Sequence, residues 1–435
     1  MLRVAVPVVL AELGWMSMGV VDTIMVGPLG PAAIAAAGVG TSLHMAFAIF
    51  GMGLLLGLDT LVSQAYGARQ ITECHRWLIH GVVLALLLAT PVMLICFGLH
   101  WSIPLLGFHG EVLPLLESFF AVIIWSTPSL LLYAAFRRYL QGIHVVGPIT
   151  FALVSANLVN AGLNWAFIYG HAGFPAMGVA GSAWATFVSR AYMAAVLLIA
   201  IVVHDRWRPS DLRAAVIRWP ALRRLIELGF PAASTVALEV GVFAAATALA
   251  GRLAPVSAAS HQIALNIAAV SFMVPLGLAS AGAVRVGHAV GAGSPPRAAA
   301  AGWTAILLGV GFTLVAALAF LVIPRTLIGV FTREEEVLAL GSTLLFVAAI
   351  FQLFDGLQGV ATGVLRGLGD TRTPMITNLA AHWLFGLPVG YTLCFFVGVG
   401  VVGLWIGLST GLIIAGIVLV CFWHRRVRQL ADSIE

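Results

Sequence analysis

The sequence predicts an all-α integral membrane protein with twelve transmembrane helices, arranged as two six-helix bundles. Hydrophobic residues make up 61% of the 435 positions and charged residues only 9%, whereas soluble domains average about a quarter charged residues. Apolar stretches of about 20 residues recur along the whole chain, and each is long enough to cross a bilayer. The charged residues gather in the gaps between these stretches. This distribution excludes a soluble globular fold.

The apolar runs also predict how the chain is oriented in the membrane. An even number of spans places both termini on one side. Eighteen of the 22 arginines fall on that side, so the positive-inside rule predicts cytoplasmic termini in a cell (inner or plasma) membrane. The expected spans are 4–26, 32–58, 78–99, 114–136, 148–169, 179–203, 225–250, 258–283, 301–323, 338–362, 375–397 and 401–423.

The sequence excludes several classes of protein. The arginines sit at helix ends and form no basic patch for nucleic acid. The chain has no lysine and no G-x-x-x-x-G-K-[ST] motif, which excludes a built-in ATP motor. The four cysteines and twelve histidines lack metal-ligand or redox spacing. The first apolar run has no small-residue cleavage site and leads into another span, so no cleavable signal is expected.

The longest polar segment, 205–224, divides the spans six and six. Its tryptophans, prolines and arginines predict an interfacial segment on the inner leaflet. We therefore expect an N-terminal six-helix lobe at 1–204, a cytoplasmic linker at 205–224, a C-terminal six-helix lobe at 225–424 and a cytoplasmic tail at 425–435.

The two halves share landmarks in the same order. Because each copy contains six spans, both insert with the same polarity and should be related by a pseudo-twofold axis along the membrane normal. Such duplication favours a transporter that alternates between inward-open and outward-open states. The matching landmarks are Pro7 and Pro231, Ala65–Ala68 and Ala289–Ala292, Leu140–Ile143 and Leu365–Leu368, Pro148 and Pro374, and Gly178–Gly181 and Gly400–Gly403, at offsets of 222 to 226.

Two acids in the second half are the leading candidates for ion coupling. A carboxyl at a helix centre costs about 2.5–3.5 kcal/mol, so each one needs a reason. Asp355 lies deep in its span with Gln352 and Gln358 one turn away on either side, and Glu239 lies near the middle of its own span. Burial disfavours the charged form, so either could take up a proton; ionised, either could bind sodium or attract a cationic substrate. The competing interpretation is a structural acid held by hydrogen bonds or an arginine.

The sequence suggests more than one role for several other polar residues. Asp22 in the first span is a third candidate coupling residue. Glu12 receives no role beyond lining a cavity, and Asp59 is expected to cap a helix or shape a gating loop. Arg190 is expected to pair with a buried acid or with carbonyls. The remaining candidates either line the cavity or join helices by hydrogen bonds: Asn157, Asn160 and Asn164 on one helix stripe, Gln262 and Asn266 at i, i+4, and the aromatic residues Trp15, Trp383 and Tyr133.

Several motifs together resemble the multidrug and toxic compound extrusion (MATE) family. These are Gly57–Thr60 with Gln64–Gly67, Val274–Gly277 with Val286-Gly287 and Val290–Gly293, Leu365–Asp370 with Thr371 and Pro374, and Val21–Gly27. The resemblance implies a drug or cation antiporter driven by protons or sodium. It points to Glu239 and Asp355 as the coupling-ion site of the NorM-like branch, and Asp22 matches an acid that the family uses. Asn164 stands where the DinF-like branch has an acid, which favours the NorM-like branch.

The leading hypothesis is therefore a secondary antiporter that exports small cationic or amphipathic drugs. No cofactor is expected beyond the coupling ion, H⁺ or Na⁺, and Na⁺ would bind at Glu239 and Asp355. A monomer would suffice because one chain holds both halves. One alternative is a lipid-linked precursor flippase of the same superfamily, although such proteins usually have more spans and a cationic cavity. Another is an intramembrane enzyme, but no paired catalytic constellation is present in the spacing, so the chain is not expected to be an enzyme.

Overall fold

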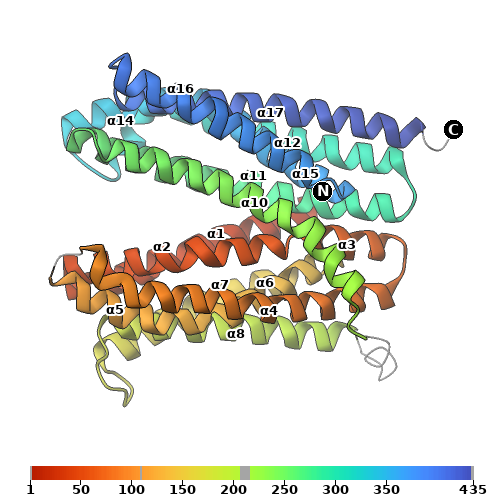
Figure 1. The fold of residues 1–435 in the computed structure, drawn as a ribbon, viewed down its shortest axis with the longest axis horizontal. Coiled ribbons are helices and arrows are strands. Elements are labelled where there is room, and N and C mark those ends of the chain that lie inside the picture. Colours follow the sequence, from red (N-terminus) through yellow and green to blue (C-terminus); the bar gives the residue numbers. More distant parts are fainter. Residues whose placement is uncertain (1, 108–109, 206–215, 433–435) are drawn as a thin grey trace. The chain divides into compact units, whose positions relative to one another are not determined.

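The computed structural model describes residues 2–107, 110–205 and 216–432 (Figure 1). Within them lie twelve helical segments long and apolar enough to cross a membrane, which confirms the predicted all-α fold and its twelve spans. Several spans extend beyond the predicted limits. The third runs from Ile71 to Leu105 instead of 78–99, because helical hydrogen bonding continues through polar residues beyond the apolar run.

The chain forms two compact units. We call Leu10–Tyr66 with Gln70–Gly229 the N-terminal unit, and Met1–Val9, Gly67–Arg69 and Phe230–Glu435 the C-terminal unit. Half of the expected interfacial segment at 205–224, residues 206–215, lies outside the described residues. Its last six residues form the first turns of a long helix that begins at Trp219.

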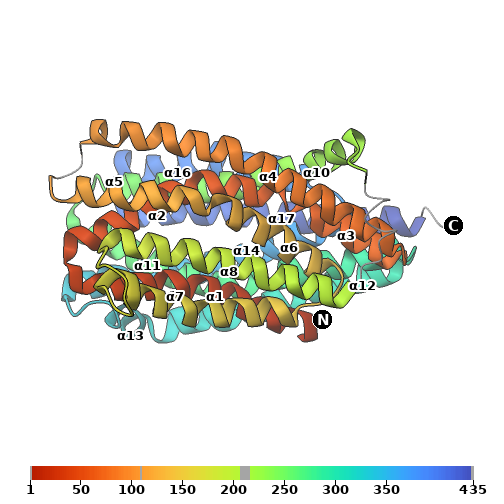
Figure 2. The ribbon, with the colours of Figure 1, turned by 90° about the horizontal axis from the view of Figure 1, so that it is seen from below.

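The helices of the N-terminal unit pack around one large apolar cluster with a smaller one beside it. Tyr133, Tyr139 and Leu131 lie in the larger cluster, and Phe119 and Phe120 in the smaller. Pairs α2 and α5, α4 and α6, and α7 and α8 lie against each other (Figure 2). The helices are α1 (Leu2–Val26), η1 (Gly27–Leu29), α2 (Pro31–Leu54), α3 (Gly57–Gly67), α4 (Ile71–Ser102), η2 (Ile103–Leu106), α5 (Val112–Ile123), η3 (Ile124–Ser126), α6 (Thr127–Gly142), α7 (Gly147–Tyr169), α8 (Val179–Asp205) and the start of α10 (Trp219–Ala250).

The C-terminal unit is built around α11 and α14, with α12 and α17 packed on them. The helices are the rest of α10, α11 (Pro255–Gly291), α12 (Pro295–Val322), α13 (Pro324–Gly329), α14 (Glu335–Leu368), α15 (Arg372–Asn378), the π-helix η4 (Leu379–Gly386), α16 (Leu387–Tyr391), the π-helix η5 (Thr392–Phe396) and α17 (Val401–Asp432).

Close helix contacts explain much of the high glycine content. A Cβ atom on Gly363 or Gly367 of α14 would lie 2.3 or 2.5 Å from a carbonyl oxygen of α11. A Cβ on Gly407 of α17 would lie 2.3 Å from the backbone of Gly390 in the eleventh span. Without a hydrophobic drive between helices in lipid, small residues that let backbones approach supply the packing.

Candidate functional site

Asp22 in the N-terminal unit is held by neutral side chains from two neighbouring helices. Its Oδ1 accepts a hydrogen bond from Asn164 Nδ2 at 2.7 Å, and Asn164 also donates to Asn160 Oδ1 at 3.1 Å. Its Oδ2 lies 3.1 Å from the hydroxyl of Thr186 on α8. Sequence reasoning placed Asn160 and Asn164 on one stripe but did not single out Thr186, which an ordinary helical threonine gave no reason to choose.

The asparagine stripe of α7 joins this helix to α1. Asn157 donates to the carbonyl oxygen of Gly14 at 2.9 Å. Tyr169, at the end of α7, donates to the carbonyl oxygen of Met25 at 2.7 Å. Together with the Asn164–Asp22 bond, these contacts join the two helices at three heights. The stripe thus connects helices, and whether it also lines a substrate cavity stays a prediction.

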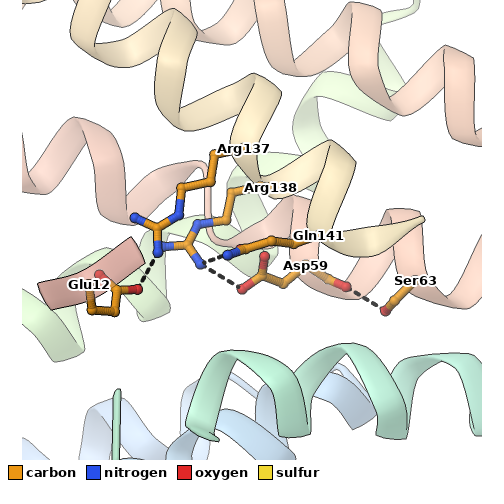
Figure 3. A network of polar contacts seen from close by, with 6 residues as sticks. All are labelled: Glu12, Asp59, Ser63, Arg137, Arg138 and Gln141. Carbon is orange, nitrogen blue, oxygen red and sulfur yellow. Dashed lines mark hydrogen bonds and ion pairs between the residues drawn. The ribbon is translucent and has the colours of Figure 1, made fainter. Parts of the chain in front are cut away.

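Glu12 and Asp59 each bind an arginine of α6 within the N-terminal unit (Figure 3). Arg137 forms a hydrogen-bonded ion pair with Glu12 of α1, and both side chains are buried. Arg138 lies 3.5 Å from Asp59 Oδ2 of α3 and 3.3 Å from Gln141 Oε1. Asp59, which was expected to cap a helix or shape a loop, lies in the first turn of α3, where it is fully buried and charge-paired.

The two arginines themselves correct a sequence expectation. The fourth span was expected to end at 136, with Arg137 and Arg138 in the inside loop. The helix continues to Gly142, and Arg137 is only 4% exposed. A buried acid such as Glu12 requires a cation, but the sequence gave no indication of which arginine supplies it, because the two are 125 residues apart.

Arg190 of α8 contacts neutral side chains. Its guanidinium donates to Ser126 Oγ at 2.6 Å and to His44 Nδ1 at 3.5 Å, and the side chain is buried. Arg190 was expected to pair with a buried acid or with carbonyls; within the described part of the chain its hydrogen bonds go to these neutral side chains, and the acid with which it interacts electrostatically is Asp22.

Glu239 belongs to a hydrogen-bonded row in the C-terminal unit. Gln358 of α14 donates to Glu239 Oε2 at 3.3 Å and to Asn378 Oδ1 at 3.0 Å, and Asn378 donates to the carbonyl oxygen of Pro374 at 3.1 Å. Asn378 ends α15 at the start of the π-helix. Sequence reasoning missed it, because its position after a loop proline gave no polar pattern.

Asp355 lies one turn before Gln358 on α14, and Gln358 contacts Glu239, so the hydrogen bond of Gln358 places the two carboxyls near each other. Asp355 is 5% exposed, and Gln352 on the preceding turn is fully buried. Both side-chain polar atoms of Gln352 and the Oε1 of Gln358 lack hydrogen-bond partners. The two candidate acids and their flanking glutamines are therefore brought together, with buried amide oxygens that have unused hydrogen-bonding capacity.

The remaining candidates divide between exposed positions and packing positions. Gln262 and Asn266 are exposed and hydrogen-bond to each other at 3.4 Å. Trp15 stacks on Tyr133 with ring centroids 6.0 Å apart, and Trp383 Nε1 donates to the carbonyl oxygen of Leu238. In the residues that the structure describes, no three histidine, cysteine or acidic side chains gather to hold a metal ion.

A membrane fold with twelve spans and paired acids at mid-span defines a polytopic transporter. The family model MatE matches residues 7–166 and 231–392. The two segments begin 224 residues apart, which is the offset between Pro7 and Pro231. The chain belongs to the MATE family of transporters, as its motifs predicted, and its class is non-enzymatic.

Relatives of similar length support the same assignment. The chain is 37% identical to the probable multidrug resistance protein NorM of Mesorhizobium japonicum, over 98% of this chain and 93% of that one. It is 35% identical to the multidrug resistance protein NorM of Burkholderia vietnamiensis, over 98% and 94%. Among solved structures, a MATE protein in a bent conformation superposes with a TM-score of 0.90 at 19% identity over 99% and 96% of the two chains. The eukaryotic MATE transporter AtDTX14 gives 0.86 at 23%, over 100% and 98%.

Proposed function

We propose that this chain is a NorM-type multidrug antiporter whose coupling ion binds at Glu239 and Asp355, with Asp22 as a third acid in the cycle. Full-length similarity to proteins named for multidrug resistance supports the export of drugs. The observation that carries the choice of site is that Gln358, one turn after Asp355 on α14, donates a hydrogen bond to Glu239 at 3.3 Å, which brings the two acids to the same place in one unit.

The geometry supports competition between a coupling ion and a cationic substrate. Two nearby carboxylates repel each other in a low dielectric, so a bound proton, sodium ion or organic cation relieves that repulsion. Sodium prefers oxygen ligands, and the Oε1 atoms of Gln352 and Gln358 are buried without partners. Entry of the ion would neutralise the acids and release the cationic drug.

The proposal also includes the orientation of the chain in the membrane and its assembly state. We expect the protein to lie in the bacterial inner membrane with both termini on its cytoplasmic side, because eighteen arginines are expected on the same side as the termini. One chain holds two matched family segments, so a monomer is sufficient for alternating access.

The test is ethidium efflux from proteoliposomes under a proton gradient and a sodium gradient imposed separately. The unaltered protein should transport under at least one gradient, and Asp355→Asn or Glu239→Gln should reduce efflux to the rate of empty vesicles. Glu227→Gln is the matched control: Glu227 lies on the same helix as Glu239 but forms exposed ion pairs with Arg223 and Arg224, and the variant should transport normally. Normal efflux by both acid variants, or no efflux under either gradient, would contradict the proposal.

A further inference from the structure

Arg190 carries a buried charge that no ion pair neutralises. The side chain is 4% exposed, and its two side-chain hydrogen-bond partners, Ser126 Oγ and His44 Nδ1, are neutral groups. Its Nε atom has no hydrogen-bond partner. Within the described residues no aspartate or glutamate lies at ion-pair distance from this guanidinium. A charged side chain at membrane depth costs free energy, so a buried arginine without an ion-pair partner calls for a functional explanation.

His44 does not supply the missing counter-charge, because its neighbours fix it as a neutral imidazole. Thr127 donates its hydroxyl proton to the carbonyl oxygen of Ile124 at 2.7 Å. It therefore accepts a hydrogen bond from His44 Nε2 at 2.9 Å. The other ring nitrogen, Nδ1, is left with a lone pair that faces the Arg190 guanidinium.

Asp22 is the acid whose charge reaches Arg190. Thr186, which contacts Asp22 Oδ2 at 3.1 Å, precedes Arg190 by four residues on α8. Side chains at i and i+4 of a helix lie on the same face about 6 Å apart, so this spacing brings the guanidinium near the carboxyl. Asp22 is also the acid with which Arg190 interacts electrostatically.

The other ionisable groups nearby are engaged elsewhere. Helix α8 packs against α2, α5, α6 and α7. From α2 His44 faces Arg190, and on α6 Arg137 is paired with Glu12 of α1. The acid of α5, Glu117, has no electrostatic interaction with Arg190. On α7 the residues near Asp22 are asparagines. Asp22 and Arg190 are thus the two opposite charges of this cluster.

We propose that Arg190 is a positioning residue that acts through Asp22: its guanidinium supplies the counter-charge for the ionised carboxyl and thereby sets the pH at which Asp22 takes up a proton. The pair is held apart by Thr186 and the neutral acceptors around Arg190, so protonation breaks no direct ion pair. It leaves instead one uncompensated positive charge inside the N-terminal unit.

The consequence for transport rests on the proposed function. With Asp22 ionised the cluster is neutral, and an organic cation near it meets no repulsion. With Asp22 protonated the charge of Arg190 stands alone and repels that cation through a medium of low dielectric. Proton uptake at Asp22 therefore favours release of the cation, and Arg190 provides the repulsive element.

The test compares five proteins: the unaltered chain, Arg190→Gln, Arg190→Lys, Asp22→Asn and the double variant Arg190→Gln with Asp22→Asn. Infrared difference spectra of the purified proteins, titrated with pH, report the C=O band of a protonated carboxyl without requiring transport. The band that Asp22→Asn removes identifies Asp22. In parallel, ethidium efflux is measured as a function of pH. Arg223→Gln, which changes an exposed arginine of α10, is the control and should leave both readouts unchanged.

Loss of the charge favours the protonated carboxyl, so Arg190→Gln should move the midpoint of the Asp22 band upward by on the order of one pH unit. The efflux profile should move in the same direction. Arg190→Lys keeps the charge and should titrate close to the unaltered chain. In the Asp22→Asn background, Arg190→Gln should have no further effect on the pH profile.

Three outcomes would overturn the proposal: an unchanged band in Arg190→Gln, a lysine variant that titrates like the glutamine variant, or a pH shift that persists without Asp22. If Arg190→Gln does not fold, the lysine variant still decides between charge and shape. If ethidium is not transported at all, the proposed function fails, while the infrared titration still tests the link between Arg190 and Asp22.

Discussion

The buried pair of Glu12 and Arg137 gives a stability prediction that can be worked from the structure. Glu12→Gln keeps the size of the side chain but leaves the Arg137 guanidinium without a counter-charge. Asp59, the other acid that interacts with Arg137, is itself paired with Arg138, and Arg137 Nε has no hydrogen-bond partner, so the lost ion pair is not replaced. Removing one partner of a buried ion pair costs about 3–5 kcal/mol. We expect the free energy of unfolding to fall by that amount, roughly a hundred- to several-thousand-fold in the equilibrium constant.

The measurement is unfolding in mixed micelles, titrated with a denaturing detergent and followed by tryptophan fluorescence. Arg137→Gln should be similarly destabilised, whereas the double variant with Glu12→Gln should recover much of the loss, because no unpaired charge remains. The coupling energy of this cycle is expected to be about 2–3 kcal/mol. Glu227→Gln, in an exposed pair with Arg223, should cost only about 0.3–0.5 kcal/mol.

A Glu12→Gln variant as stable as Glu227→Gln would refute the reasoning. Losses that simply add in the double variant would do the same, since they would show that the two side chains contribute independently. Either result would mean that the ion pair does not hold α1 to α6.

Three further predictions concern packing, accessibility and topology. Gly302→Ala on α12 should lower the midpoint of thermal unfolding, because the added Cβ would lie 1.9 Å from the Trp423 ring. Gly311→Ala on the same helix should leave the midpoint unchanged, because its Cβ would have no neighbour within 4 Å. Equal midpoints for the two variants would contradict this prediction. In mild detergent a maleimide should label one thiol per chain, that of Cys421, because the other three are buried; labelling that persists in Cys421→Ser would contradict this. A fluorescent protein fused to the C-terminus should become fluorescent in cells, as expected of a cytoplasmic end; a dark fusion at normal expression would place that end outside.

The spans and the family could be predicted because they depend on local composition and order. An apolar run long enough to cross the bilayer needs no tertiary information, and the motifs that begin at Gly57 and Leu365 lie in continuous sequence. The proximity of Asp355 and Gln358 followed from helical spacing. Each of these inferences uses residues close together in the chain.

The polar contacts between helices could not be predicted, since they depend on how each helix is rotated about its axis. Glu12 and Arg137, or His44 and Arg190, are far apart in sequence, and no pattern selects one arginine over another. The π-helices of the eleventh span add a second obstacle. Their wider turn changes the angle between successive side chains, so an α-helical wheel misplaces residues that follow the start of the π-helix, such as His382.

Positions that correspond in the two halves of the internal repeat share packing residues but do not share the candidate acids. This difference indicates that the two lobes contribute different chemistry. At the offset of 224, Glu239 corresponds to Trp15, which stacks on Tyr133, and Asp22 corresponds to the buried Ala246. At 225, Asp355 corresponds to the buried Leu130. The C-terminal unit thus pairs two acids with amides, whereas the N-terminal unit sets one acid near an arginine without an ion pair. Under the proposed function, a cation bound near the two acids would be retained until an ion neutralises them, and one near Asp22 and Arg190 would be repelled once a proton arrives. Duplicated helices with unlike charges would therefore let ion uptake weaken substrate binding at two separate sites, one in each unit.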